Sequence, residues 1–390
     1  MSIKLKLLLI VLPSMLALTV TTALLLRQVS QRSVEGAARQ VVASAGGALD
    51  QLEKGDVEKL DTALAALQSH PGLAEAFAAR DRERLLALAA PIFKRLREQH
   101  DVTHWYFITP DQHVCFLRVH KPSLFGDVID RATLKKSVKV NGLGAGKELG
   151  QTAFALRVVQ PWVVGGKLLG YMELGEEIDH FLGRMKDQTG NDFGLLVEKK
   201  NLDPVVWAKT RGDKRNNWDD QPSTVVVNAT TGDEGIVGFA EALGSLPDGG
   251  RVLESAEHGG RVLLRAVLPV QDVAGRKIGG LFVLHDITEL HRGMVRDRDR
   301  VVALFVLAGV LLSIALLAVF QRLVFRRLTS MMATLEDVSA RLAGGDYEAA
   351  KDYRPGGKDE IGAFETFFAQ FLQVMGGSLR DLQARTRKAG

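Results

Sequence analysis

Two long runs without a charged residue constrain the fold of this 390-residue chain more than any other feature; they occupy residues 7–26 and 301–320. A helix of about 20 apolar residues is long enough to cross the hydrocarbon core of a bilayer, so we predict a transmembrane helix in each run. We expect the first helix to be an uncleaved anchor, because its apolar stretch is longer than that of a signal peptide and no small-x-small cleavage site follows cleanly. The chain is therefore predicted to cross a membrane twice.

The charge and the reactive residues argue against several classes of function. The net charge of +4 is spread along the sequence without a long basic run, so we expect no nucleic-acid partner. The single cysteine, Cys115, cannot form an intrachain disulfide. The sequence has no Ser/His/Asp grouping, no phosphate-binding loop and no kinase motif. We therefore predict that the protein is not an enzyme and that it needs no cofactor.

Residues 321–375 carry two short apolar stripes with the spacing of a coiled coil. The first stripe recurs at steps of 3, 4, 3 and 4, and it consists of Leu328, Met331, Leu335, Val338 and Leu342. Glycines and a proline interrupt the helix, and the same spacing then returns at Ile361, Phe364, Phe368, Phe371 and Met375. Neither helix can bury its stripe alone, so we expect two helices from each of two chains to form a parallel four-helix bundle.

This segment resembles the HAMP domain of bacterial transmembrane receptors. The resemblance rests on the stripe that directly follows an apolar run, on the connector Gly345-Asp346-Tyr347, and on Asp359-Glu360-Ile361-Gly362 at the start of the second helix. Arg327 departs from it, because many such domains have a proline there. The resemblance implies a cytoplasmic location, a homodimer, and signalling through Leu328, Met331, Leu335, Asp359, Glu360, Gly362, Phe364 and Phe368. Residues 376–390 would form a short cytoplasmic tail.

The segment from 27 to 300 begins with a helical stripe and contains an internal repeat. The stripe predicts a dimer stalk, and its members are Val34, Ala38, Val41, Ala45, Ala48 and Leu52. The repeat pairs LRVVQPWVVGGKLLGYMELGEEI, from Leu156, with LRAVLPVQDVAGRKIGGLFVLHDI, from Leu264. Each copy reads as a strand, a glycine-bearing turn and a second strand. Two similar modules in tandem follow from it.

This arrangement, with the stretch HWYFITPDQHVCFLRVHKPSLFGDVIDRATL over residues 104–134, resembles the double Cache sensory region of two-component kinases and chemoreceptors. The resemblance implies a distal module at about 70–188 and a proximal module at about 189–290. The predicted fold class is α+β: two tandem PAS-like modules on a long helix, flanked by two transmembrane helices and followed by a coiled-coil HAMP bundle.

A candidate ligand site lies in the HVCFLRVH stretch. Side chains of a strand alternate between its faces, so Phe116, Arg118 and His120 are expected to point the same way and to suit a small anion. The other candidate ligand-binding residues are Tyr106, Arg157, Tyr171 and Glu173. An alternative is that Arg118 pairs with Asp127 or Glu173 to pin a loop, and that Arg157, which recurs as Arg265, serves the fold. Trp105 and Trp162 are expected in the core.

Four histidines within 21 residues, His100, His104, His113 and His120, raise the question of a metal site. His113 and His120 lie seven residues apart on one expected strand and would face opposite sides of it, so they could not share an ion there. We predict no metal.

These features predict a homodimeric, two-pass receptor of the bacterial inner membrane that binds a small anionic ligand in the periplasm. Its partners would be that ligand, the membrane and a cytoplasmic histidine kinase or other output protein, or else a fused output domain outside this sequence. Two alternatives stay open: a non-signalling accessory subunit that presents solute to a transporter, and a structural dimer with an empty sensor.

Overall fold

The computed structural model describes residues 3–150, 154–212, 214–346, 348–355 and 360–389. They form two compact units. Residues 29–294 make up the sheet unit, and residues 1–28 together with 295–390 make up the helical unit.

The first module of the sheet unit is a five-stranded antiparallel sheet with the order β2-β1-β5-β4-β3. Its strands are β1 (His104–Ile108), β2 (Cys115–Arg118), β3 (Gly144–Leu149), β4 (Phe154–Val164) and β5 (Lys167–Glu177). Its helices are α2 (Pro71–Ala78), α3 (Arg82–His100) and α4 (Ala132–Val140). The Asp81 side chain accepts a hydrogen bond from the backbone N–H of Arg84 and so caps the start of α3.

The second module repeats this sheet with the order β7-β6-β10-β9-β8. Its strands are β6 (Asp192–Glu198), β7 (Thr224–Ala229), β8 (Arg251–His258), β9 (Arg261–Gln271) and β10 (Lys277–Asp286). Helix α5 (Asp179–Thr189) joins the modules, and α6 (Pro204–Thr210) lies between β6 and β7. Leu156 and Leu264, where the two copies of the sequence repeat begin, fall on β4 and β9, which hold equivalent places in the two sheets. The prediction of two similar modules is confirmed.

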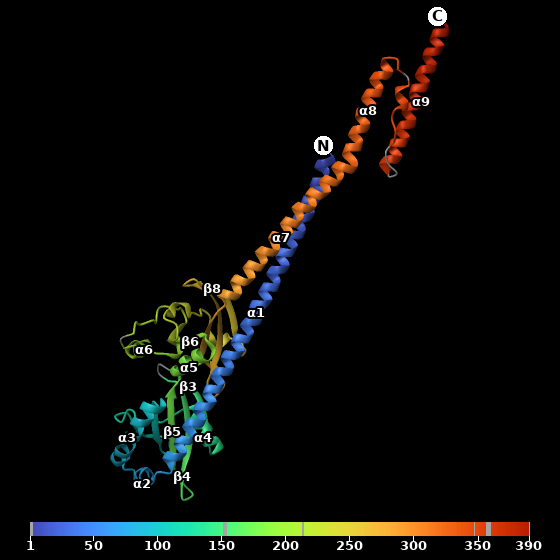
Figure 1. Ribbon diagram of the computed structural model, residues 1–390. Helices are drawn as coiled ribbons and strands as arrows, with labels where there is room; N and C mark the ends of the chain where they lie inside the picture. The colour runs from blue at the N-terminus through green and yellow to red at the C-terminus, as the bar shows by residue number, and fades with distance from the viewer. Residues whose placement is uncertain (1–2, 151–153, 213, 347, 356–359, 390) are drawn as a thin grey trace. The chain divides into compact units, whose positions relative to one another are not determined.

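Helix α1 (Ile3–Gln68) supplies one face of the core in both modules, and the two sheets follow one another along it (Figure 1). Val41, Ala45 and Leu52 are buried in the core that the helix shares with the sheets, and Ala38 packs with Leu264. The interpretation of this stripe as a dimer stalk is therefore wrong, because the chain's own strands already cover it. Trp105 and Trp162 are fully buried, as expected.

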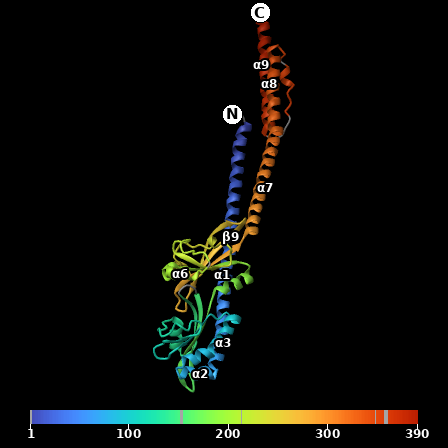
Figure 2. The same ribbon diagram turned by 90° about the vertical axis from the view of Figure 1, so that its left-hand side faces the viewer.

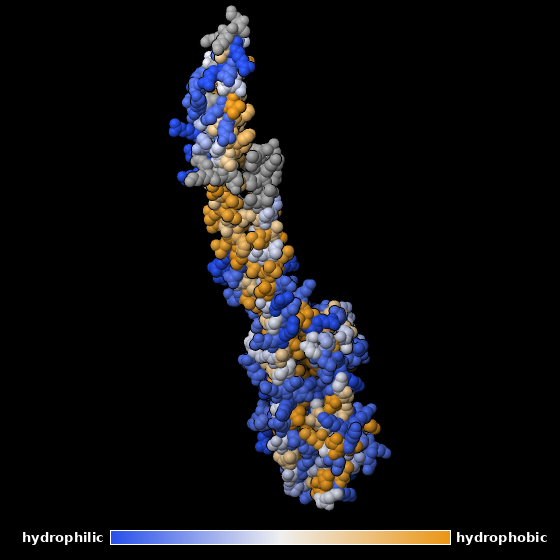
Figure 3. All heavy atoms as spheres, turned by 90° about the vertical axis from the view of Figure 1, so that its right-hand side faces the viewer, coloured by the Kyte–Doolittle hydropathy of each residue, from blue (hydrophilic) through white to orange (hydrophobic). Residues whose placement is uncertain are grey.

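The helical unit holds the apolar runs. Two helical stretches are long and apolar enough to cross a membrane, Leu12–Gln68 and Thr288–Ala343. Within them, α7 (Thr288–Phe320) continues through a π-helical turn (Gln321–Phe325) into α8 (Arg326–Ala343). Side chains such as Leu16 and Leu304 are about two thirds exposed, at 66% and 64%, and Figure 3 shows apolar side chains gathered over this part of the unit.

Helix α9 (Glu360–Ala389) lies beside α8 and runs in the same direction, after a connector that returns along them (Figures 1 and 2). The buried contact between them includes Val338, Leu342 and Leu372. An ion pair joins the two helices near their starts. Arg327 donates to the carboxylate of Glu365 from Nε, at 3.0 Å, and from Nη2, at 2.7 Å. Glu365 is 5% exposed.

The predicted stripes divide between this contact and the outer surface. Met331, Val338 and Leu342 are buried, whereas Phe364 and Phe371 are 53% and 52% exposed. The expectation that the second stripe is covered only when two chains meet is wrong for Phe368. This side chain packs beside Val338, Leu342 and Leu372 of its own chain, and its ring lies 5.5 Å from that of Tyr353. The predicted signalling residue Asp359 and the connector residue Tyr347 lie outside the described residues, as does the side chain of Glu360.

Candidate functional site

One face of the first module's sheet gathers polar side chains around Tyr106. On β1, Tyr106 lies opposite Arg118 of β2 and opposite Glu173 of β5. Arg157 comes from β4, where it pairs with Gly175 two residues along β5 from Glu173. Because alternate residues of a strand share a face, Arg157 and Glu173 meet on the Tyr106 side of the sheet.

A β-bulge breaks the alternation that the sequence predicted for β2. Leu117 pairs with Phe107, but the next pair joins Ile108 to Cys115, so Phe116 has no partner on β1. The ring of Phe116 consequently packs against Phe77, at 5.4 Å between centroids. The expectation that Phe116 shares a face with Arg118 is wrong.

Glu173 is the buried acid at the centre of this face. Its side chain is fully buried, and its Oε1 accepts hydrogen bonds from Arg157 Nη1 and Arg131 Nη1, each at 2.5 Å. Arg131 Nη2 also donates to the Tyr106 hydroxyl at 3.0 Å. The guanidinium carbons of Arg131, Arg118 and Arg157 lie 4.5, 5.3 and 5.8 Å from the centre of the Tyr106 ring, within cation–π range.

Two neutral histidines complete the face. The His120 ring lies 4.9 Å from that of Tyr106 and 4.8 Å from that of His104. Burial lowers the pKa of His120 to about 4, and burial together with nearby Arg157 lowers the pKa of His104 still further. His120 Nδ1 accepts a hydrogen bond from the backbone N–H of Trp105, so the ring proton sits on Nε2 as a neutral donor.

This polar face of the sheet borders an open pocket of about 960 Å³. Of the predicted site residues, Tyr106, Arg118, His120 and Arg157 are among the residues that line it. Phe116, Tyr171 and Glu173 are not: Glu173 lies buried beneath the wall, and Tyr171 is 5% exposed with its ring 5.5 Å from that of His113.

The loop between β2 and α4 forms one rim of the pocket and is held by Arg118. The guanidinium donates to both carboxylate oxygens of Asp127, at 2.7 and 2.6 Å, and to the carbonyl oxygen of Leu124 at 2.8 Å. These contacts raise the pKa of Arg118, chiefly through the bond to Asp127. The alternative that Arg118 pairs with Asp127 is confirmed. The Asp127 side chain is 51% exposed, so one side of this ion pair faces solvent.

Sequence reasoning missed several lining residues. Arg131 and Lys121 come from the rim loop, where no periodicity marks them. Asp272 and Arg276 come from the β9–β10 turn of the second module, which reaches the pocket of the first. Their position depends on how the two modules dock, and a single sequence carries no signal for that.

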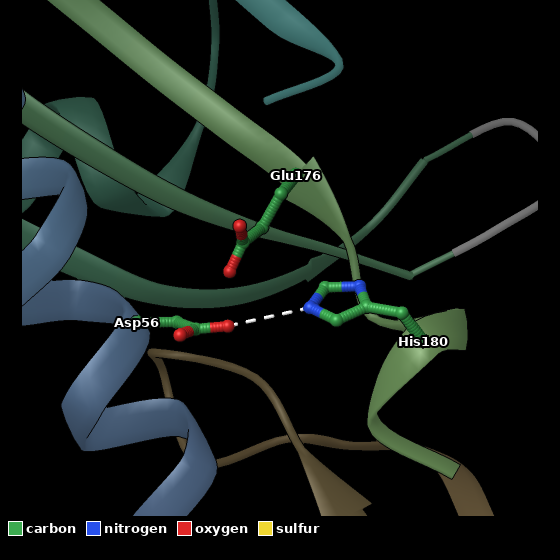
Figure 4. A group of neighbouring side chains, drawn as sticks. All are labelled: Asp56, Glu176 and His180. Carbon is green, nitrogen blue, oxygen red and sulfur yellow. Dashed lines mark hydrogen bonds and ion pairs between the residues drawn. The ribbon is translucent and has the colours of Figure 1, made fainter. Parts of the chain in front are cut away.

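A second polar cluster lies between α1 and the end of β5, on the other face of the sheet. Asp56, Glu176 and His180 point toward one another, with potential metal-ligand atoms within 4.8 Å (Figure 4). The ammonium of Lys59 lies 2.6 Å from Glu176 and 3.4 Å from Asp56, and Arg184 lies 3.2 Å from Asp56. Lys59 and Arg184 already occupy the space beside the two acids, so the cluster is better described as an ion-pair network than as a metal site.

Comparisons with known proteins bear on the sheet unit. Residues 37–291 match the family described as the double sensory domain of two-component sensor kinases. The ligand-binding domain of the Campylobacter jejuni chemoreceptor Tlp3, solved with 4-methylisoleucine, is 11% identical; the match covers 66% of this chain and 92% of that one, with a TM-score of 0.37. The periplasmic domain of Vibrio cholerae LuxQ is also 11% identical, covering 63% and 98%, with a TM-score of 0.35. No curated protein sequence matches the chain.

Proposed function

Because the chain belongs to the family of double sensory domains of two-component sensor kinases, we propose that it is a membrane receptor whose first module binds a small acidic molecule. The observation that carries this proposal is the pocket beside Tyr106, where three guanidinium groups surround one aromatic ring. Polar groups that converge in a concave site are the usual mark of a ligand site.

The donors that the pocket's own acids leave free favour an anion. Five carboxylates line the pocket, and four of them, Asp127, Asp130, Glu148 and Asp272, pair with cations of the protein. His104 and His120 are neutral near pH 7 and add donors without charge, whereas Arg118 and Lys121 add positive charge at the rim. Arg131 and Arg157 are committed to the buried Glu173, so they form the wall and orient Tyr106. Arg118 is the group that we assign to the ligand carboxylate, which would join or replace Asp127.

The same proposal covers the rest of the chain. Residues 7–26 and 301–320 would span the bacterial inner membrane and leave residues 27–300 in the periplasm. The α8–α9 pair would form a HAMP bundle with a second copy of the chain. Ligand binding shifts an equilibrium between two packings of that bundle, which is read by a histidine kinase or another output module.

A thermal-shift screen of the purified full-length chain in detergent tests the ligand site. A ligand that binds the native state raises the melting temperature, so a set of carboxylates, amino acids and phosphate esters should contain at least one compound that does so. Arg118→Ala should abolish most of the shift. Arg251→Ala, which removes an exposed arginine of the second module that pairs with Glu241, should leave it intact.

Two results would count against the proposal. One is a screen without any stabilising acid, and the other is a stabilising compound whose effect is the same in Arg118→Ala and in the wild type. The accessory-subunit alternative shares the binding result but predicts no change in a partner kinase on addition of the ligand.

A further inference from the structure

The β9–β10 turn of the second module docks on the edge strand of the first module. The backbone N–H of Val273 donates to the carbonyl oxygen of Lys147 on β3, at 3.2 Å. Gly146 faces the Val273 side chain, and a Cβ at that glycine would lie 2.8 Å from the Val273 Cβ. The φ of Gly146 is +151°, which also favours glycine. The two modules therefore touch next to the pocket.

The turn holds Arg276 in a fixed position. Asp272, whose side chain is 2% exposed, accepts hydrogen bonds from the backbone N–H groups of Ala274 and Arg276, at 2.9 and 2.8 Å. Its other oxygen binds Nε of Arg276 and lies 2.7 Å from Nη2. The Arg276 side chain is 74% exposed, and among the described residues its Nη1 has no hydrogen-bond partner. One edge of the guanidinium is anchored, and the other is available.

The cations around the pocket differ in how far they are satisfied. Arg131 and Arg157 form ion pairs with Glu173, and Arg118 forms an ion pair with Asp127. Within the described part of the chain, Lys121 makes no ion pair. Its positive charge partly offsets the rise that burial causes in the pKa of nearby Glu177. Lys121 and Arg276 thus retain donors that none of the residues described by the structure uses, and they belong to different modules.

We propose that Arg276 is a ligand-contacting residue and that the pocket takes a small molecule with two acidic groups, one held by Arg118 and Lys121 of the first module and the other by Arg276 of the second. This inference rests on the proposed function of the pocket. A molecule with one carboxylate engages only one of these sets of donors, while a pocket of about 960 Å³ has room for a longer ligand. A charge-assisted bond to an arginine fork gives the second acidic group its affinity.

The position of Arg276 also connects the ligand to the helical unit through the chain itself. Arg276 directly precedes β10 (Lys277–Asp286), and α7 begins at Thr288. A ligand that binds Arg276 therefore contacts the chain directly before the strand that leads into the second apolar helix. A ligand held by the first module alone lacks this connection.

The test compares matched acids on the full-length chain in detergent by isothermal titration. Succinate, glutarate and adipate carry two carboxylates, and butyrate, valerate and hexanoate are the corresponding acids with one. We expect at least one dicarboxylate to bind about tenfold more tightly than its monocarboxylate partner. In Arg276→Gln this advantage should disappear, because the amide still reaches Asp272 but carries no charge. Arg251→Gln, an exposed ion-paired arginine on β8 outside the pocket, should keep it.

The outcomes separate the two proposals. If Arg276→Gln melts at the wild-type temperature and binds a dicarboxylate as tightly as the wild type does, Arg276 is not a ligand contact. Equal binding of mono- and dicarboxylates overturns the proposal that the ligand carries two acidic groups, but it does not affect the proposal that the protein is a receptor for a small acidic molecule. Wild-type protein that binds none of the six acids also overturns this inference, while the receptor proposal is decided by the broader thermal-shift screen.

Discussion

Two buried acids on opposite faces of β5 organise the first module at the scale of single residues. Glu173 faces the pocket, where Arg131 and Arg157 hold it, and Glu176 faces α1, where Lys59 holds it. Both side chains are fully buried, so each would be costly without its cations. Burial raises the pKa of Glu176 to about 8, against the effect of Lys59. Glu176 is therefore mostly protonated near pH 7, and β5 carries a buried acid with a cationic partner on each side.

We predict that Lys59→Ala destabilises the protein by about 3 kcal/mol, or by about 6–12 °C in melting temperature, because it leaves the buried Glu176 without its hydrogen-bond donor and Asp56 with one cation fewer. The double variant Lys59→Met with Glu176→Gln should recover most of this loss. Circular dichroism melts of the full-length chain provide the measurement. Zn²⁺ or Mn²⁺ should not stabilise the wild type, since Lys59 occupies the space between the acids. A metal-induced rise in melting temperature would show that the ion-pair description of Figure 4 is incorrect.

At the scale of helices and strands, the α8–α9 pair leaves an apolar stripe on its surface. Phe364, Phe367, Phe371 and Val374 follow one another at steps of 3, 4 and 3 on α9, and each is more than half exposed. Leu335 of α8 is 38% exposed. The described part of the chain does not cover this stripe, and its coiled-coil spacing is that of a surface which a second copy would bury.

We predict that Phe371→Glu abolishes a disulfide crosslink between two chains engineered at Leu335→Cys. The charge would enter the seam between copies, while the contact of α9 with α8 through Leu372 would remain. Gln373→Glu, an exposed polar position on the same helix, is the control and should crosslink normally. Crosslinking of Phe371→Glu at the wild-type level, measured in membranes without detergent, would rule out this stripe as the dimer seam.

The sequence predicted elements well where a pattern is local. The repeat from Leu156 and Leu264 located the last two strands of each module, because alternating apolar residues and a glycine turn define a hairpin without reference to the rest of the chain. The stripe on α1 was misassigned, since periodicity shows which face of a helix is buried but not whether the cover is its own chain.

The candidate site was predicted only in part for the same reason. Tyr106, Arg118, His120 and Arg157 reach the pocket. Phe116 turns away because a bulge adds one residue to β2, and a bulge is invisible to an alternation rule. Arg276 lies 119 residues beyond Arg157 in the sequence and reaches the pocket through the docking of one module on the other.

At the scale of the whole molecule, we propose an acidic ligand that binds beside Tyr106 and contacts both modules of the sheet unit. This proposal rests on the family match over residues 37–291, on the pocket beside Tyr106, and on the β9–β10 turn that reaches it. It implies that ligand binding slows local opening at two separated stretches of the sheet unit, one in each module.

Amide hydrogen exchange on the full-length chain in detergent, with and without a saturating acid from the thermal-shift screen, measures this directly. The account predicts that the ligand protects peptides covering residues 104–131, at the pocket wall and rim, and peptides covering residues 272–278, at the β9–β10 turn. Peptides covering residues 203–222, in the connection between β6 and β7, should exchange as before. Protection confined to residues 203–222, or the absence of any change at residues 104–131, would contradict the account.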